Sequence, residues 1–96
     1  MTDSHLSDFT PRFPLGQLVI TSRARKALSD EELILSISRH LRGDWGELDR
    51  KNRKRNEKAL EKGGRLFSTY QPGDTRFWII TEGDRSATTI LLPDEY

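Results

Sequence analysis

The sequence predicts an α+β domain with the element order β-α-α-α-β-β-β, in which an antiparallel sheet carries the helices on one face and the fold has two layers. Three β-rich runs follow one another in residues 65–92, and the five-residue connections between them allow only antiparallel pairing. Residues 22–62 instead carry helix-capping residues and apolar side chains at three- and four-residue spacing. An earlier β-rich run, residues 15–21, is expected to join the sheet.

The length and composition of the chain allow only one domain. A chain of 96 residues with 33% hydrophobic side chains has room for one core, so residues 13–96 are expected to form a single domain after a flexible tail, residues 1–12. The chain has no cysteine, which excludes disulfides, thiol catalysis and thiolate zinc sites. Neither a membrane span nor a signal peptide is recognisable, so we expect a cytoplasmic protein without membrane contact.

The N-terminal part of the domain begins with a strand and a short helix. LGQLVIT, residues 15–21, is rich in aliphatic and β-branched side chains, which are typical of strands. Thr21 or Ser22 can end this strand by capping the first turn of a helix over SRARKAL, since both hydroxyls accept a hydrogen bond from a free backbone N–H.

The next helix has the clearest boundaries in the sequence. Ser29 precedes Glu32 by three residues, the spacing of a capping box, and Gly43 can adopt the left-handed conformation that ends a helix. Basic side chains gather before Gly43, where they suit the negative end of the helix dipole. The predicted buried stripe consists of Leu33, Ile34, Ile37 and Leu41.

A third helix, about residues 48 to 62, is strongly basic and ends at Gly63-Gly64. Residues 49–62 hold seven basic and three acidic groups, a net charge of +4, whereas residues 74–96 hold two and five, a net charge of −3. The apolar face of this helix is thin and half polar. Its main cations fall within an arc of about 140°; they are Arg50, Lys51, Lys54, Arg55, Lys58 and Lys62.

Three strands are predicted at residues 65–70, 76–81 and 87–92. Pro72-Gly73 and Gly83-Asp84 supply turn chemistry between them, so the strands should form an antiparallel meander. FWII within the second run is apolar at four successive positions, which favours a central strand with both faces at least partly covered.

The stretch RHLRGDWGELD offers one candidate catalytic site. His40 could act as a base, and Asp44 and Glu47, with Glu82 as a further carboxylate, could hold a hard cation in a metal-assisted hydrolase or nuclease. The interpretation we favour is a structural corner, with Trp45 as a plug and Asp44 and Glu47 at capping-box spacing. On this interpretation no metal site and no cofactor is expected.

Other candidate sites are suited to binding. In TEGDRS, Asp84 and Arg85 project from a turn, where they could contact a partner or only satisfy backbone groups. The aromatic set contains Trp78 and Tyr70, and strand alternation should leave part of it exposed as a protein-binding or homodimer surface. The basic helix could contact phosphates, but it has no aromatic residue among its cations to stack on bases, so we expect nucleic-acid binding to be weak.

Several stretches together resemble a family of small, mostly uncharacterised bacterial proteins from plasmids and integrated elements, some of them labelled as a subunit of type I restriction methylases. The resemblance rests on FPLGQLVIT, RHLRGDWGELD and FWIITEGDRSATTILLPDEY, and on the spaced residues Asn56, Ala59, Leu60, Gly64 and Arg65. Methylase activity is not expected, because it requires a doubly wound sheet with a glycine-rich cofactor loop. The resemblance implies an accessory role on mobile elements, and we expect a protein-interaction module rather than an enzyme.

Overall fold

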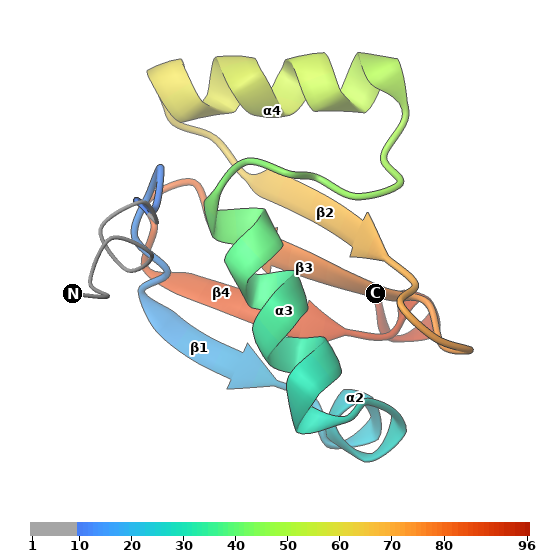
Figure 1. Cartoon of the computed structure of the whole chain (residues 1–96). Coiled ribbons are helices and arrows are strands. Elements are labelled where there is room, and N and C mark those ends of the chain that lie inside the picture. Colours follow the sequence, from blue (N-terminus) through green and yellow to red (C-terminus); the bar gives the residue numbers. More distant parts are fainter. Residues whose placement is uncertain (1–9) are drawn as a thin grey trace, which may run out of the picture.

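A four-stranded sheet with helices on one side confirms the predicted fold class (Figure 1). The computed structural model describes residues 10–96, so residues 1–9 of the predicted tail lie outside the described part. The elements are β1 (Gln17–Ile20), α2 (Ser22–Ala27), α3 (Asp30–Leu41), α4 (Arg50–Lys62), β2 (Leu66–Tyr70), β3 (Phe77–Thr81), β4 (Ala87–Leu91) and the 3-10 turn η1 (Pro93–Glu95). No helix in this part of the chain is both long and apolar enough to cross a bilayer.

The sheet has the order β1-β4-β3-β2. The predicted meander is confirmed, since β2 pairs with β3 and β3 with β4 in antiparallel register. β1 pairs with β4 in parallel, with Leu18 opposite Thr88, so the sheet is mixed rather than wholly antiparallel. The helices connect β1 to β2, which lies at the opposite edge of the sheet and runs in the same direction as β1. Because β3 is antiparallel to β2 and β4 is antiparallel to β3, β4 runs parallel to β1.

The helices form the second layer. α3 crosses the face of the sheet, while α4 lies along the β2 edge (Figure 1). One core cluster lies between α2, α3 and the sheet and includes Leu33, Tyr70 and Ile79, and a second lies near α4 and includes Trp45 and Leu66. Ile34 was expected in the buried stripe, but it is 65% exposed because α3 meets the sheet along a narrower line through Leu33, Ser36 and His40.

Helix caps were predicted better for α2 and α3 than for α4. Thr21 caps α2, and Ser29 and Glu32 form the expected capping box. α4 begins at Arg50 because Asp49 accepts a hydrogen bond from the backbone N–H of Asn52 at 2.9 Å. The capping box predicted between Asp44 and Glu47 is therefore wrong; no helix begins at that point.

The outer edge of β2 is covered instead of being left open. The segment 45–47 lies along it, with Glu47 N–H donating to Thr69 O at 2.8 Å and Thr69 N–H donating to Trp45 O at 3.2 Å. The Asn56 side chain donates to Phe67 O at 2.7 Å and accepts from Phe67 N–H at 3.2 Å. These contacts satisfy the backbone groups of an edge strand that could otherwise pair with another chain.

Close approach at this edge makes Gly46 a strong test of the corner. Its φ is +75°, and a Cβ there would lie 2.1 Å from Thr69 O and 2.7 Å from the Tyr70 ring. Gly63 has a similar φ of +80° with nothing within 4 Å of the corresponding Cβ position, so it is a matched control.

We expect Gly63→Ala to lower the free energy of unfolding by about 1 to 3 kcal/mol through backbone strain, because residues with a Cβ rarely adopt a φ of +80° with a ψ of 142°. Gly46→Ala should lower it by at least about 2 kcal/mol more, because a clash with backbone adds to the strain of its positive φ. Urea denaturation of both variants measures the difference. Equal losses would contradict the close packing of this corner on β2.

Candidate functional site

His40, the candidate base, lies in the core. Its side chain is 0% exposed, and its ring nitrogens contact Ser68 Oγ at 2.5 Å and Thr81 Oγ1 at 2.9 Å. The chain of hydrogen bonds continues from Thr81 to Thr88 at 2.8 Å and from the Thr88 hydroxyl to Leu15 O at 2.7 Å.

The donors and acceptors along these hydrogen bonds fix the tautomer of His40. The Thr88 hydroxyl donates to a carbonyl, so it accepts from Thr81, whose oxygen in turn accepts from His40 Nε2–H. Nδ1 is then the acceptor for the Ser68 hydroxyl. Burial, with a smaller contribution from the charge of Arg85, lowers the pKa of His40 to about 3. His40 is therefore a neutral structural residue without access to a substrate.

The candidate carboxylates do not converge on His40 or on each other. Asp44 accepts two hydrogen bonds from Arg39, at 2.8 and 3.1 Å, and this guanidinium holds the pKa of Asp44 below its usual value. Glu47 pairs with Arg76 at 2.8 Å. Glu82 pairs with Arg65 at 3.4 Å. Within residues 10–96 no group of three His, Asp or Glu side chains is placed to hold a metal ion.

Trp45 fills the corner, as the favoured interpretation expected. It is 3% exposed, stacks on Phe13 with ring centroids 6.3 Å apart, and meets His40 edge-on at 5.7 Å. Its indole N–H donates to Glu57 Oε2 at 3.1 Å, and the same carboxylate receives the guanidinium of Arg12. Arg12 was assigned to the flexible tail, but these contacts and its backbone bond to Leu41 O attach it to the domain.

Arg85, a predicted binding residue, is occupied inside the molecule. It has a φ of +63°, and its guanidinium donates to Ala59 O at 3.0 Å and to Gly64 O at 2.6 Å. It therefore joins the β3–β4 turn to the C-terminal end of α4. Asp84 is exposed and accepts from Ser86 N–H at 3.0 Å, which is the turn role considered for it.

Tyr70 and Trp78 lie on opposite faces of the sheet. Tyr70 is 1% exposed, its hydroxyl donates to Asp44 O at 2.6 Å, and the guanidinium of Arg39 lies 4.8 Å from its ring centroid. An exposed binding role for Tyr70 is therefore wrong: alternation along β2 turns it, with Leu66, toward the helices. Trp78 is partly exposed on the face that α3 does not cover.

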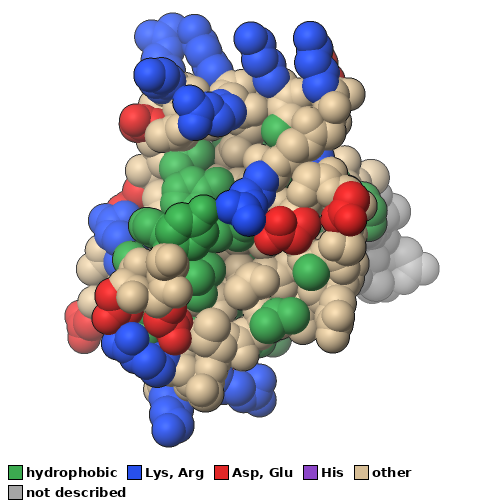
Figure 2. All heavy atoms as spheres, turned by 180° about the vertical axis from the view of Figure 1, so that it is seen from behind, with side chains coloured by type: hydrophobic (Ala, Val, Ile, Leu, Met, Phe, Trp, Pro, Cys, Tyr) green, Lys and Arg blue, Asp and Glu red, His purple; other side chains and the backbone are tan. Residues whose placement is uncertain are grey.

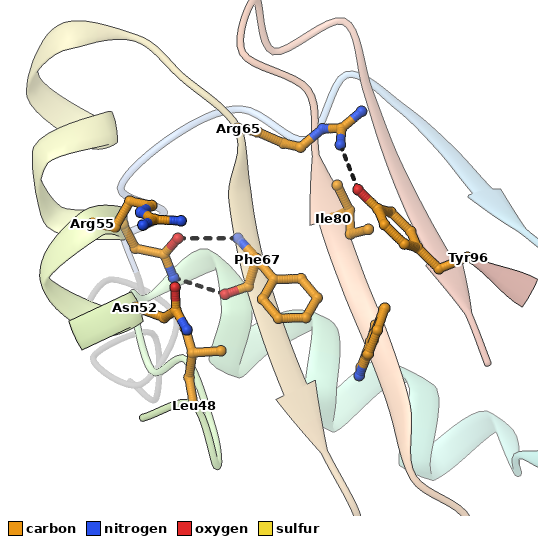
Figure 3. A pocket seen from close by; sticks show the side chains of 9 residues that line it. Leu48, Asn52, Arg55, Arg65, Phe67, Ile80 and Tyr96 are labelled. Carbon is orange, nitrogen blue, oxygen red and sulfur yellow. Dashed lines mark hydrogen bonds between the residues drawn. The ribbon is translucent and has the colours of Figure 1, made fainter. Parts of the chain in front are cut away.

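Beside Trp78 lies a groove of about 320 Å³ between α4 and the outer face of the sheet (Figure 3). Trp78 meets Phe67 edge-on at 4.9 Å and Tyr96 at 5.4 Å between ring centroids, so the three rings form a continuous aromatic row. Arg65 donates to the Tyr96 hydroxyl at 2.8 Å. The lining residues are Leu48, Asn52, Arg55, Asn56, Arg65, Phe67, Trp78, Ile80 and Tyr96.

Several polar groups at this groove are unused. Among residues 10–96, nothing bonds to the Asn52 side-chain amide, to the indole N–H of Trp78 or to the guanidinium of Arg55. All three groups remain available to a ligand. The sequence gave no signal that Asn52, Arg65 and Tyr96 would meet at one groove, because these residues come from separate parts of the chain.

The outer face of α4 carries the cations predicted from the helical wheel, and all six are exposed. No carboxylate in the described part of the chain lies within 4.0 Å of any of them. Glu57 could have neutralised this face, but it is turned to Arg12 and Trp45. Figure 2 shows the cations of α4 projecting above an apolar patch on the uncovered side of the sheet.

Comparisons with protein-family models, with curated proteins and with solved structures gave no match. The geometry of the chain itself is therefore the basis for assigning a function. The resemblance to proteins of plasmids and integrated elements stays a prediction.

Burial of neutral His40 predicts a specific pH dependence of stability. The unfolded chain takes up a proton below its ordinary pKa of 6.5, whereas the folded protein does so only near 3, so the free energy of unfolding falls as the pH drops from 6.5 toward 3. Between about pH 7 and pH 5 the loss should reach about 2 kcal/mol.

Urea denaturation at the two pH values measures this loss, and a His40→Gln variant should show little of it. Any contribution from the other histidine, His5, is common to both proteins and cancels. An equal pH dependence in the two proteins would show that His40 is not held neutral in the fold.

Proposed function

We propose that this protein binds nucleic acid through the cationic face of α4 and catalyses no reaction of its own. The observation that carries the proposal is a face of six exposed cations without a carboxylate partner in residues 10–96. Phosphate contacts by such cations release counterions condensed on the nucleic acid, which favours binding most strongly at low salt. A cytoplasmic location, where nucleic acid is present, is part of the proposal.

The position of the aromatic groove supports nucleic acid over a protein partner for this surface. The sequence alone predicts only weak nucleic-acid binding by this helix, because no side chain that could stack on a base lies among its cations. In the fold, Phe67 and Trp78 lie in a groove that Asn52 and Arg55 of α4 also line. Cations that track a backbone beside rings that stack on bases are the combination found in single-strand binders.

A second candidate function is protein binding or homodimer formation on the opposite side of the domain. On α3, Ile34 is 65% and Leu35 is 58% exposed, and on β1, whose outer edge pairs with no strand among residues 10–96, Leu18 is 41% exposed. Exposed apolar side chains beside an unpaired strand edge suit a protein partner. This surface takes the place of the one predicted around Tyr70, and it leaves α4 unobstructed.

The charge of α4 can be tested with two variants that remove equal charge. Lys54→Gln/Lys58→Gln acts on the proposed surface, and Arg25→Gln/Lys26→Gln removes two exposed cations from α2. We expect the α4 variant to weaken binding to a labelled oligonucleotide and to reduce the slope of log affinity against log salt by about 1.5, whereas the α2 variant should change neither markedly.

Fluorescence anisotropy between about 0.05 and 0.2 M salt measures both quantities. The free energy of unfolding, measured by thermal denaturation, should differ by less than about 1 kcal/mol among the wild type and the two variants, since all four substituted side chains are exposed. If the α4 and α2 variants lose the same affinity for the oligonucleotide, net charge alone attracts the nucleic acid, and a binding face on α4 is contradicted. The absence of binding to any nucleic acid would also contradict the proposal.

A further inference from the structure

We propose that the groove between α4 and the outer face of the sheet receives an unstacked base, so that the protein binds single strands of DNA or RNA in preference to duplex. This inference rests on the proposed function, because the cations of α4 are needed to hold the strand.

The floor of the groove is an aromatic surface whose rings contact one another. Phe67 lies opposite Ile80 in the β2–β3 ladder, so both point to the face that α3 leaves uncovered, and Trp78 stands on the same face. Phe67 and Tyr96 contact the indole edge-on, at interplanar angles of 82° and 66°. The Trp78 ring is therefore fixed by its neighbours, while it stays partly exposed. A fixed, partly exposed ring is suited to stacking on a base.

The rim supplies groups that a nucleotide can use. Asn52 offers both a donor and an acceptor from its free side-chain amide, and a base edge presents the complementary pair. Arg55 lines the groove on the same helix and has no acidic partner among residues 10–96, so it can bind a phosphate. Arg65 is partly neutralised by Glu82 and already bonds to Tyr96, so we assign it to positioning Tyr96.

The size of the groove and the access of a base to the Trp78 ring favour a single strand over a duplex. At about 320 Å³ the groove lies near the lower limit of small-molecule pockets, which suits one base with its sugar. In a duplex the base faces are stacked on their neighbours and cannot reach the Trp78 ring without unpairing. The cations of α4 begin at the groove, because Arg55 belongs to both surfaces, so a strand held by the helix can turn a base into it.

The test compares a single-stranded oligothymidylate of about ten nucleotides with a duplex of the same length. The wild-type protein should bind the single strand at least about tenfold more tightly. Trp78→Leu should weaken single-strand binding about 5- to 100-fold and change duplex binding less than about twofold. Val19→Ala, which trims an exposed apolar side chain on β1, outside the groove and at the other edge of the sheet, is the control and should bind both like the wild type.

Trp78→Phe separates stacking from a structural role. The phenyl ring keeps a stacking surface, so this variant should retain most of the affinity that Trp78→Leu loses. Binding of the single strand should quench the indole fluorescence of the wild-type protein, and this quenching should disappear in Trp78→Phe, because the remaining Trp45 is 3% exposed and lies outside the groove. Asn52→Ala should weaken single-strand binding about 3- to 10-fold without affecting the duplex.

The possible failures are distinguishable. If Trp78→Leu leaves single-strand binding unchanged while Lys54→Gln/Lys58→Gln still weakens it, the groove is not the base site and the proposed function stands. Equal binding of single strand and duplex by the wild type would overturn the inference in the same way. If no nucleic acid binds, both proposals fail. Trp78-dependent binding of polyglutamate, tighter than that of the oligothymidylate, would replace the base with an acidic protein segment as the occupant.

Discussion

His40 joins the helical layer to the whole meander through one run of hydrogen bonds. From α3 its ring contacts Ser68 of β2 and Thr81 of β3, and the run continues through Thr88 of β4 to the backbone of Leu15. All four side chains are 0% exposed, so water cannot replace a missing partner. A buried polar network of this kind is favourable only when every member is satisfied, and it therefore defines where α3 sits over the sheet.

The placement of α4 follows from a different constraint. Its inner face is poor in apolar side chains, with Asn56 and Ala59 as its buried residues, so it cannot pack over a hydrophobic sheet face as α3 does. It lies at the β2 edge instead, attached by Asn56 to the backbone of Phe67 and by Arg85 to the carbonyl of Ala59. This position has two consequences that matter for function. The outer face of the sheet stays uncovered, and a groove forms beside it.

None of the five ion pairs within residues 10–96 includes a cation of α4: four join residues outside the helix, and the fifth joins Glu57 to Arg12. In the described part of the chain, four of these pairs lie around the corner and the sheet ends, and arginines occupy the carboxylates that were candidates for a catalytic cluster, such as Asp44 and Glu47. Because Glu57 is held by Arg12 and Trp45, one of the two glutamates of α4 is turned away from the cations of the helix. The surface chemistry that remains is attraction of anions beside an aromatic floor.

The sequence by itself determined the element order, the caps of α2 and α3, the antiparallel meander and the cationic stripe, because each depends on residues within a few positions of one another. Only the tertiary structure decided the parallel direction of β1, the start of α4 at Arg50 after its Asp49 cap, the inward side of Tyr70 and the internal use of Arg85. It also decided the groove, whose lining residues run from Leu48 to Tyr96. These features depend on contacts between distant segments, and such contacts arise from where whole elements pack, which no local pattern of residues specifies.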